Sequence, residues 1–407
     1  MKFIRIGVKS IISLLLVALL AITATSVSRV YRFAEPQPFS GAKIFNPYRN
    51  FSSEQGWKRG NFHTHTRVDG LLNECEYTPE QTLEFYERFG YDIVTFSNHN
   101  ALTLHPRDPQ LQVNLYEHGY NLFKFHKLVF GCDKVNRFDH LLPFFASQRQ
   151  MQIDMLAENS DIIVLNHPLR THLTTTKLLE RLSGYDIIEL DSGKSTENDY
   201  WDAALSAGHY SFGIANDDLH YPDRTGAIAV RCNFLQTPSQ RYEDIVRTLK
   251  EGCFYAMRLP DYGNGDWQTK VEKNKSIPYI KNIGVTECGS VYIALSEQAD
   301  NIKITGQNHS TLASALNADS LSYTMQPNDP YCRITAYFAD GEVIYTNPFA
   351  RYDGAENSLP TQQATHSVDI LLTALFNIAL AILFIGIGTI LYKTIFVWQI
   401  FSSKNDR

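Results

Sequence analysis

Two long apolar runs lie near the ends of the chain and interrupt an otherwise mixed pattern of hydrophobic and polar positions. No charged residue occurs between Ser10 and Ser28, and none occurs between Ile370 and Tyr392. The second run has about 23 residues and, at about 1.5 Å per helical residue, can cross the roughly 30 Å hydrocarbon core of a bilayer. It shows no polar face, so we predict a transmembrane helix over residues 369–392.

The first apolar run fits either a cleaved signal peptide or an uncleaved signal anchor over residues 1–29. No convincing cleavage site of small residues follows it, which favours the anchor. Basic residues flank the outer end of each run: Lys2, Arg5 and Lys9 before the first, and Lys393, Lys404 and Arg407 after the second. Because such residues are enriched on the cytoplasmic side, we expect both termini in the cytoplasm. The chain between them would then lie at the outer face of the cytoplasmic membrane.

Between the apolar ends, residues 57–260 repeat a pattern in which a helical stretch precedes a short apolar run that ends in polar residues. Thr78 and Pro79 are typical of a helix start and Gly90 of its end. The apolar runs that follow such stretches are 93–96, 160–165, 185–190 and 210–215. Helix–strand alternation predicts parallel strands, whose carboxyl ends collect polar residues in a closed barrel. We therefore predict an α/β fold with a β/α barrel, and a doubly wound open sheet is the alternative.

Beyond the turn-rich segment 261–266 the pattern changes to short runs of alternating apolar and polar residues. These runs are 291–295, 301–305, 321–325, 332–338 and 343–346. Period-two alternation with turns between the runs predicts a small β-sandwich domain over residues 276–353. Residues 30–56 and 354–368 are predicted linkers, and residues 393–407 form a predicted cytoplasmic tail.

Composition narrows the possible partners. The 407 residues carry a formal net charge of −6, which argues against a general nucleic-acid surface, because phosphate backbones attract strongly basic patches. A nucleotide or another phosphorylated small molecule held through metal ions is compatible with this charge. The six cysteines form no CxxC zinc motif. One or two disulfides are possible in an oxidising compartment, although we expect each thiol to be buried and inert.

His63 and His65 form the sharpest candidate metal pair. Residues two apart on a strand point to the same face, so both imidazoles can hold one divalent cation, and Asp69 can return from the following loop. Asp218 and His220 repeat this spacing after another apolar run. Further candidate ligands follow separate apolar runs: His99, His167, and Asp133 with His140. Mixed histidine and carboxylate ligands suit zinc, manganese or iron, and their number indicates two or three metal ions.

Several neighbouring divalent ions favour hydrolysis of a phosphate ester by metal-activated water, because they lower the pKa of a shared water and hold phosphoryl oxygens. Asp69 and Asp133 are the candidate catalytic acids, and Arg170 can bind a substrate phosphate or form an ordinary surface salt bridge. Glu189 and Asp191 can contact the ligand side chains without binding the metal ions themselves. The remaining histidines are predicted to be structural or solvent-facing: His105, His118, His126, His172, His209, His309 and His366.

The order of these motifs resembles the polymerase and histidinol phosphatase (PHP) domain family. The motifs are HxH followed by Asp-Gly, a strand ending in His-Asn, Gly-x-acid followed by His, Asn-His-Pro, and Asp-x-His, between Trp57 and Pro260. The resemblance implies a distorted seven-stranded β/α barrel, a trinuclear metal site and hydrolysis of phosphomonoesters or phosphodiesters, including nucleotides and sugar phosphates. The positions that match family ligands are His63, His65, Asp69, His99, Asp133, His140, His167, Asp218 and His220.

Two positions depart from the family pattern. Asn98 stands where the family usually has Asp, and Asp133 stands where it usually has a bridging Glu. These departures keep a second class of function open, a membrane-anchored metal-containing binding or assembly module without turnover. A third class is a hydrolase of carbon–nitrogen bonds, because amidohydrolase barrels use similar ligands. The sequence indicates no partner for the β-sandwich region.

Overall fold

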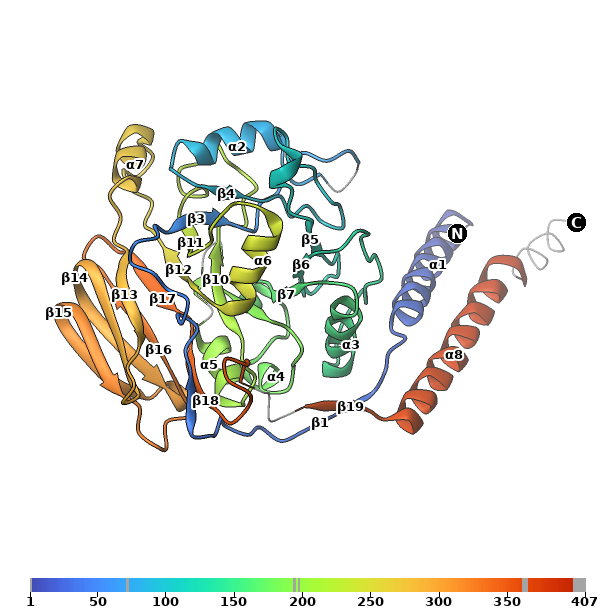
Figure 1. Cartoon of the computed structure of the whole chain (residues 1–407). Helices are drawn as coiled ribbons and strands as arrows, with labels where there is room; N and C mark the ends of the chain where they lie inside the picture. Colours follow the sequence, from blue (N-terminus) through green and yellow to red (C-terminus); the bar gives the residue numbers. More distant parts are fainter. Residues whose placement is uncertain (1, 71–72, 193–194, 197, 361–364, 398–407) are drawn as a thin grey trace, which may run out of the picture.

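Two large β-sheets with helices around them form the globular part of the protein, and two long helices project from it (Figure 1). The computed structural model describes the whole chain except residues 1, 71–72, 193–194, 197, 361–364 and 398–407. The described residues form a mixed α/β structure, as the alternating pattern predicts. The α-helices are α1 (Lys2–Thr25), α2 (Pro79–Glu87), α3 (Ala146–Ala157), α4 (Thr176–Leu179), α5 (Asn198–Ser206), α6 (Tyr242–Glu251), α7 (Trp267–Asn274) and α8 (Ile370–Tyr392).

The first sheet is built from short buried strands. In spatial order they are β10 (Phe212–Asn216), β8 (Ile187–Ser192), β7 (Ile162–Leu165), β6 (Lys127–Phe130) and β5 (Leu115–His118), with β9 (Ser195–Thr196) beside β8. β10, β8 and β7 are parallel, whereas β6 is antiparallel to both β7 and β5. All of β7 is buried, as is typical of a strand covered on both faces. The carboxyl ends of β5, β7, β8 and β10 therefore lie at one edge, and the carboxyl end of β6 lies at the other.

The second sheet joins the amino-terminal and carboxyl-terminal parts of the chain. Its main path is β13 (Ile280–Val285), β14 (Ser290–Gly306), β16 (Tyr331–Tyr337), β17 (Val343–Thr346), β12 (Phe254–Arg258), β11 (Arg231–Leu235), β3 (Lys58–Asn61) and β4 (Ile93–Val94). Three further strands lie beside it: β15 (Thr311–Thr324) pairs with β14, and β18 (Phe349–Tyr352) pairs with β16 and β2 (Lys43–Phe45). β17 pairs with β12 from Tyr255↔Thr346 to Arg258↔Val343. The expected small sandwich is therefore continuous with the preceding sheet, because β17 occupies the open edge of β12.

The described strands do not form one clear closed barrel, so the predicted barrel is not confirmed. The two sheets meet through two isolated parallel bridges, Thr64↔Leu219 and His99↔Glu117. β3 and β4 are short and parallel to each other, and the chain leaves regular pairing just beyond their carboxyl ends. The bridges bring the carboxyl ends of β3 and β4 next to those of β10 and β5.

Helix α2 begins where the sequence predicts. Thr78 accepts a hydrogen bond from the Gln81 amide, and the Gln81 side chain accepts one from the Thr78 amide, which forms a capping box with Pro79 at the first helical position. Gly90, just beyond the helix, has φ +72°. That conformation suits glycine and turns the chain into β4.

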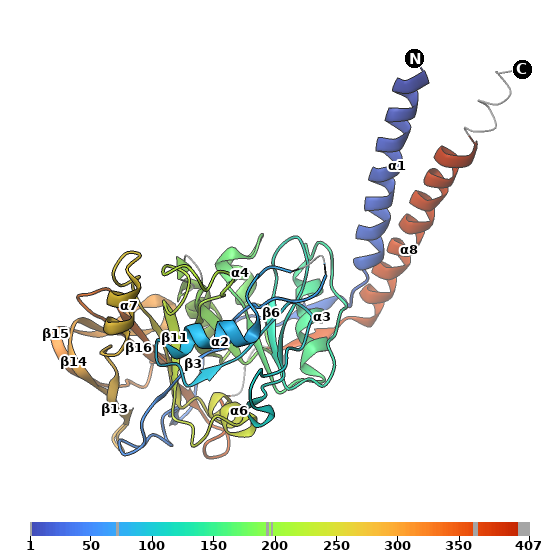
Figure 2. The same ribbon diagram turned by 90° about the horizontal axis from the view of Figure 1, so that it is seen from above.

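Helices α1 and α8 lie side by side and leave the same side of the globular part (Figure 2). Asn377 in α8 accepts a hydrogen bond from the Ser28 amide (3.2 Å) and donates one to the Ser28 carbonyl (2.9 Å). An antiparallel pair of strands, β1 (Tyr31–Phe33) and β19 (His366–Val368), joins the segments that connect the helices to the globular part. By length and composition, segments Gly7–Thr25 and Ile370–Ile395 can each cross a membrane.

Two hydrophobic clusters form the core: the first contains residues of both sheets, and the second contains mainly residues of α2 and the second sheet. Trp201 of α5 is fully buried in the first cluster, and its indole nitrogen donates a hydrogen bond to the Ser211 carbonyl (3.1 Å). All six cysteines are free, and only Cys288 is exposed, so the prediction of buried thiols is confirmed for the other five.

Candidate metal centre

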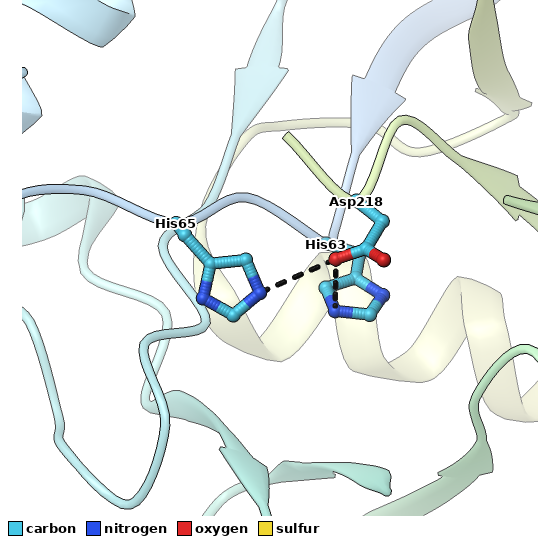
Figure 3. Close-up of side chains that lie close together, drawn as sticks. All are labelled: His63, His65 and Asp218. Atoms are coloured by element: carbon cyan, nitrogen blue, oxygen red, sulfur yellow. Dashed lines mark ion pairs between the residues drawn. The ribbon is translucent and has the colours of Figure 1, made fainter. Parts of the chain in front are cut away.

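His63 and His65 follow β3 and are almost completely buried. The His65 amide donates a hydrogen bond to the Leu219 carbonyl (2.8 Å), which holds this segment beside the end of β10. Asp218, which follows β10, places its Oδ1 atom 3.1 Å from Nε2 of His63 and 3.3 Å from Nε2 of His65 (Figure 3). The spacing of two residues therefore brings both imidazoles to one carboxylate, next to which a shared cation was predicted.

Glu117 of β5 lies at the middle of the centre, and it is not among the ligands predicted from the sequence. Its side chain is buried, and its two oxygens reach histidine nitrogens from several segments. Oε1 lies 3.2 Å from Nε2 of His63, 3.2 Å from Nδ1 of His126 and 3.4 Å from Nε2 of His167, and Oε2 lies 3.2 Å from Nε2 of both His65 and His99. A lone acid inside the short run Leu115–His118 was the available signal, because a buried carboxylate needs partners of opposite charge.

Glu74 and His126 complete the cluster. Glu74 Oε2 lies 3.2 Å from Nε2 of His99 and 3.4 Å from Nε2 of His220. His126 precedes β6, and its ring lies 4.8 Å from that of His99. The structure thus brings Glu74 into the cluster where Asp69 was predicted to contribute, and it also brings in His126, for which the sequence suggested a structural role.

Three predicted site residues lie outside the cluster. Asp69 and Asp133 are exposed, and neither belongs to a group of potential ligands among the described residues. His140 is buried elsewhere, where its Nε2 donates to the Val27 carbonyl (3.1 Å) and its Nδ1 accepts from Gln152 (3.0 Å). The direction of β6 explains this result. Asp133 and His140 follow the carboxyl end of an antiparallel strand, which points away from the edge where the other ligands meet.

Within the described residues, four groups of side chains can each hold a metal ion. Their ligand atoms lie within 4.8 Å of one another in each group. The groups are His63–His65–Asp218, His63–Glu117–His167, His65–Glu74–His99 and His99–Glu117–His126. His63, His65, His99 and Glu117 each belong to two groups, so neighbouring cations would share ligands.

The protonation pattern around His63 fits bound cations. Its Nδ1 donates to Glu189 Oε1 (3.0 Å), which directs Nε2 at the carboxylates of Glu117 and Asp218. The Nε2 atoms of His63 and His65 are buried and make no hydrogen bond of good geometry within the described part of the chain. Carboxylates that face Nε2 in this way are balanced by a positive charge, which is a proton on the imidazole when no cation is bound and which divalent ions would replace.

The charges at the centre shift several pKa values. Burial lowers the pKa of His63, but the carboxylates of Asp218, Glu117 and Glu189 outweigh it and raise that pKa well above its usual value. Burial raises the pKa of Glu117, but the charges of His99, His63 and His126 bring it well below the usual range. The pKa of Asp218 is likewise lowered overall, by His63 and His65 against the effect of burial. The carboxylates are therefore ionised and can act as ligands at neutral pH.

Two of the candidate ligands adopt a backbone conformation that side-chain-bearing residues rarely take. His167 has φ +28° and Asp218 has φ +48°. The His167 amide donates to Glu189 Oε2 (3.0 Å), and Pro168 follows it directly. Such strain, held in place by surrounding contacts, is typical of functional sites.

Asn98 has a structural role that accounts for its amide. Its Nδ2 donates to the hydroxyls of Thr66 (2.8 Å) and Thr103 (2.7 Å), and its Oδ1 accepts from the Thr66 amide (2.8 Å). An aspartate could not donate these two bonds. Asn98, at the position where the family usually has Asp, therefore stabilises the segment that carries His65. The candidate ligands stay in place.

Glu189 orients two candidate ligands through contacts on the side that faces away from the cluster. Its replacement by Gln tests this orienting role. Besides contacting His63 and His167, its Oε1 accepts from Asn216 (3.0 Å). We expect Glu189→Gln to weaken metal binding about 10- to 100-fold, because carboxylates behind metal-binding histidines set their tautomer and orientation. Isothermal titration of the metal-free protein with zinc or manganese measures this effect.

The matched control is Glu342→Gln, which changes a buried glutamate that accepts a hydrogen bond from Tyr262 outside the centre. Its metal affinity should equal that of the parent protein. Equal losses in both variants would contradict an orienting role for Glu189. Asp191, the other acid predicted behind the ligands, instead pairs with Arg231.

Comparisons with known proteins add little to this geometry. No protein-family model matches the chain, and no curated protein matches it significantly. Among solved structures, the chain is similar to a two-domain protein from Bacteroides vulgatus that is described as containing a predicted PHP-like metal-dependent phosphoesterase. The match has 13% sequence identity and a TM-score of 0.37, and covers 78% of this chain and 98% of that one. At this similarity the function of the chain rests on its own residues, above all on the histidines that surround Glu117.

Proposed function

We propose that the protein is a membrane-anchored, metal-dependent hydrolase of phosphate monoesters or diesters. The observation that carries this proposal is the position of Glu117, whose two oxygens lie within 3.4 Å of nitrogens from five histidines. A shared carboxylate surrounded by imidazoles suits two or three neighbouring divalent ions, and such clusters are suited to phosphate-ester hydrolysis. The strands β3 to β8 and β10, with the two bridges between the sheets, support the distorted seven-stranded barrel of the PHP resemblance.

The proposed ligands differ in part from the sequence prediction. Zinc, manganese or iron would be held by His63, His65, Glu74, His99, Glu117, His126, His167, Asp218 and His220. Mixed imidazole and carboxylate donors are compatible with each of these metals. Asp69 and Asp133 are not included as ligands or catalytic acids, because both lie exposed outside the cluster.

Bound divalent ions would lower the pKa of a coordinated water and neutralise charge on a phosphoryl group. The residues of the chain position the reactants. Glu189 holds His63 in one tautomer, and Arg170 pairs with the outer oxygen of Asp218. The Arg170 side chain is about one third exposed, so its guanidinium can also donate to a phosphoryl oxygen that enters the centre.

The proposed location is the outer face of the cytoplasmic membrane, with both termini in the cytoplasm. Helices α1 and α8 leave the same side of the globular part, which fits two spans with their outer ends together. The basic residues at both chain ends support the same orientation. Phosphorylated small molecules, nucleotides and other phosphate esters outside the cytoplasm are the proposed substrate class.

The test combines elemental analysis of the purified full-length protein with phosphate release from a panel of phosphate monoesters and diesters. We expect at least two metal ions per chain, in line with the overlapping ligand groups, and turnover that His63→Ala reduces by about 10³-fold or more, because several kcal/mol of charge stabilisation is lost. His105→Ala is the matched control, since His105 lies outside the cluster. Full metal occupancy without turnover of any ester would contradict the proposal and favour the metal-containing binding module.

A further inference from the structure

Exposed apolar side chains lie on three loops that contact one another, since the His172 amide donates to the Phe123 carbonyl (2.7 Å) and the Phe123 and Phe144 rings lie 5.0 Å apart. We call this set the apolar rim; it consists of Tyr120, Leu122, Phe144, Phe145, Leu169 and Leu173. Leu122, Phe145 and Leu173 are 62%, 59% and 64% exposed. Large apolar patches are rare on surfaces that face only water, so the rim indicates a contact surface.

The apolar rim borders the metal centre directly. The Tyr120 hydroxyl donates to the His99 carbonyl (2.8 Å), and the two rings lie 5.2 Å apart. Leu169 precedes Arg170, whose guanidinium pairs with Asp218. A ligand that touches the rim is therefore close to the proposed phosphoryl-binding residues.

The apolar rim is also continuous with the candidate membrane spans. The Leu122 amide donates to the Leu141 carbonyl (3.0 Å), and the Leu141 amide donates to the hydroxyl of Thr25, the last residue of α1 (3.3 Å). The rings of Phe145 and Phe376 lie 6.3 Å apart, and Phe376 is within α8. Figure 2 shows both helices leaving the globular part beside α3, which begins immediately after Phe145.

The contact of Phe145 with Phe376 indicates where the apolar rim lies relative to the bilayer. If α8 crosses a bilayer, Phe376 lies within the span, and an exposed ring in contact with it meets lipid rather than water. Phenylalanine and leucine are typical of the apolar face of segments that lie in the membrane interface. The neighbouring loops with Phe144 and Leu122 lie at the same end of the molecule through the contacts to Thr25. A bilayer surface therefore accounts for the exposed residues with no additional protein partner.

We propose that the apolar rim rests on the outer leaflet and that the metal centre hydrolyses phosphate esters of membrane lipids. This inference rests on the proposed phosphoesterase function and narrows its substrate class. Water supplies the oxygen of the new bond to phosphorus, the ester bond from phosphorus to the leaving oxygen breaks, and that oxygen receives a proton from the water. The acyl chains of the substrate stay in the bilayer while its phosphate enters between Tyr120 and Arg170.

A cross-linking experiment tests the contact without relying on activity. The full chain is reconstituted in phosphatidylcholine vesicles with a photoreactive amino acid at position 122, and in a second sample at position 316. Leu316 is the matched control, because it is 71% exposed but belongs to β15 in the carboxyl-terminal part of the second sheet. We expect lipid adducts at position 122 and none at 316. Equal labelling at both positions, or adducts to protein alone at position 122, would overturn the proposed contact.

A kinetic comparison tests the substrate class. Leu122→Ser combined with Leu173→Ser should lower kcat/KM at least about tenfold for lipid phosphate monoesters and diesters in vesicles, and leave hydrolysis of soluble nitrophenyl phosphate esters unchanged. Leu316→Ser should change neither. Hydrolysis of soluble esters without hydrolysis of any lipid ester would overturn this inference and leave the phosphoesterase proposal intact. Failure of the parent protein on both substrate types would overturn the phosphoesterase proposal, and the cross-linking result would still report on the membrane contact.

Discussion

Replacement of Glu117 by Gln is expected to lower ester hydrolysis by about 10³-fold or more and to reduce the number of bound metal ions. The amide keeps the shape of the side chain but removes the negative charge that five histidines face. A loss of about 4 kcal/mol of charge stabilisation corresponds to a rate effect of this size. Initial rates of phosphate release and elemental analysis of the same preparation measure both effects.

The control for Glu117→Gln is Asp133→Asn, which changes the acid at the position where the PHP family usually has a bridging Glu. Asp133 is exposed beyond the carboxyl end of β6, so its variant should keep full metal content and activity. Thermal unfolding of both variants distinguishes loss of metal from loss of fold. Inactivation by Asp133→Asn together with full activity of Glu117→Gln would refute the ligand set that we propose.

Replacement of Arg333 by Met is expected to destabilise the protein by about 3–5 kcal/mol. Arg333 of β16 donates from Nε to Asp202 Oδ1 (2.7 Å) and from Nη2 to Asp202 Oδ2 (2.5 Å), and both side chains are buried. Removal of the arginine leaves the Asp202 carboxylate of α5 buried, with the half-exposed His309 as its other charged partner (2.9 Å). Denaturant-induced unfolding followed by tryptophan fluorescence measures the loss, since Trp201 lies next to Asp202 and beneath the Arg333 guanidinium.

The effect of Arg333→Met should depend on pH with a defined sign. Burial raises the pKa of Asp202, but the pair with Arg333 lowers it overall, from 3.8 to about 2. A lowered folded-state pKa means that the stabilisation is fully present above about pH 4 and is lost as the pH falls through about 2. The difference between parent and variant should shrink over that interval. Lys250→Met, which breaks an exposed pair with Asp161, should cost less than about 1 kcal/mol; a similar loss in both variants would contradict the argument from burial.

Local features of the sequence were sufficient to predict several elements of the fold. The apolar runs predicted the terminal helices, and Thr78 and Pro79 predicted the start of α2, because helix caps and long apolar helices depend on neighbouring residues. The spacing of His63 and His65 predicted that both imidazoles point to one side, because alternate residues of an extended chain share a face, and both reach Asp218. The closed barrel and the separate sandwich were not confirmed, because strand pairing such as β12 with β17 joins segments far apart in the chain.

The sequence by itself determined which residue types are available for a metal centre and which stretches can become helices and strands. Only the tertiary structure decided which acids and histidines meet. Glu117 and His126 lie at one edge of the first sheet because β6 runs antiparallel to β5 and β7, and the same reversal carries Asp133 and His140 away. The direction of a strand depends on its pairing with segments that are distant in the chain. It therefore cannot be predicted from the neighbouring residues. The four overlapping ligand groups are therefore a property of the folded chain.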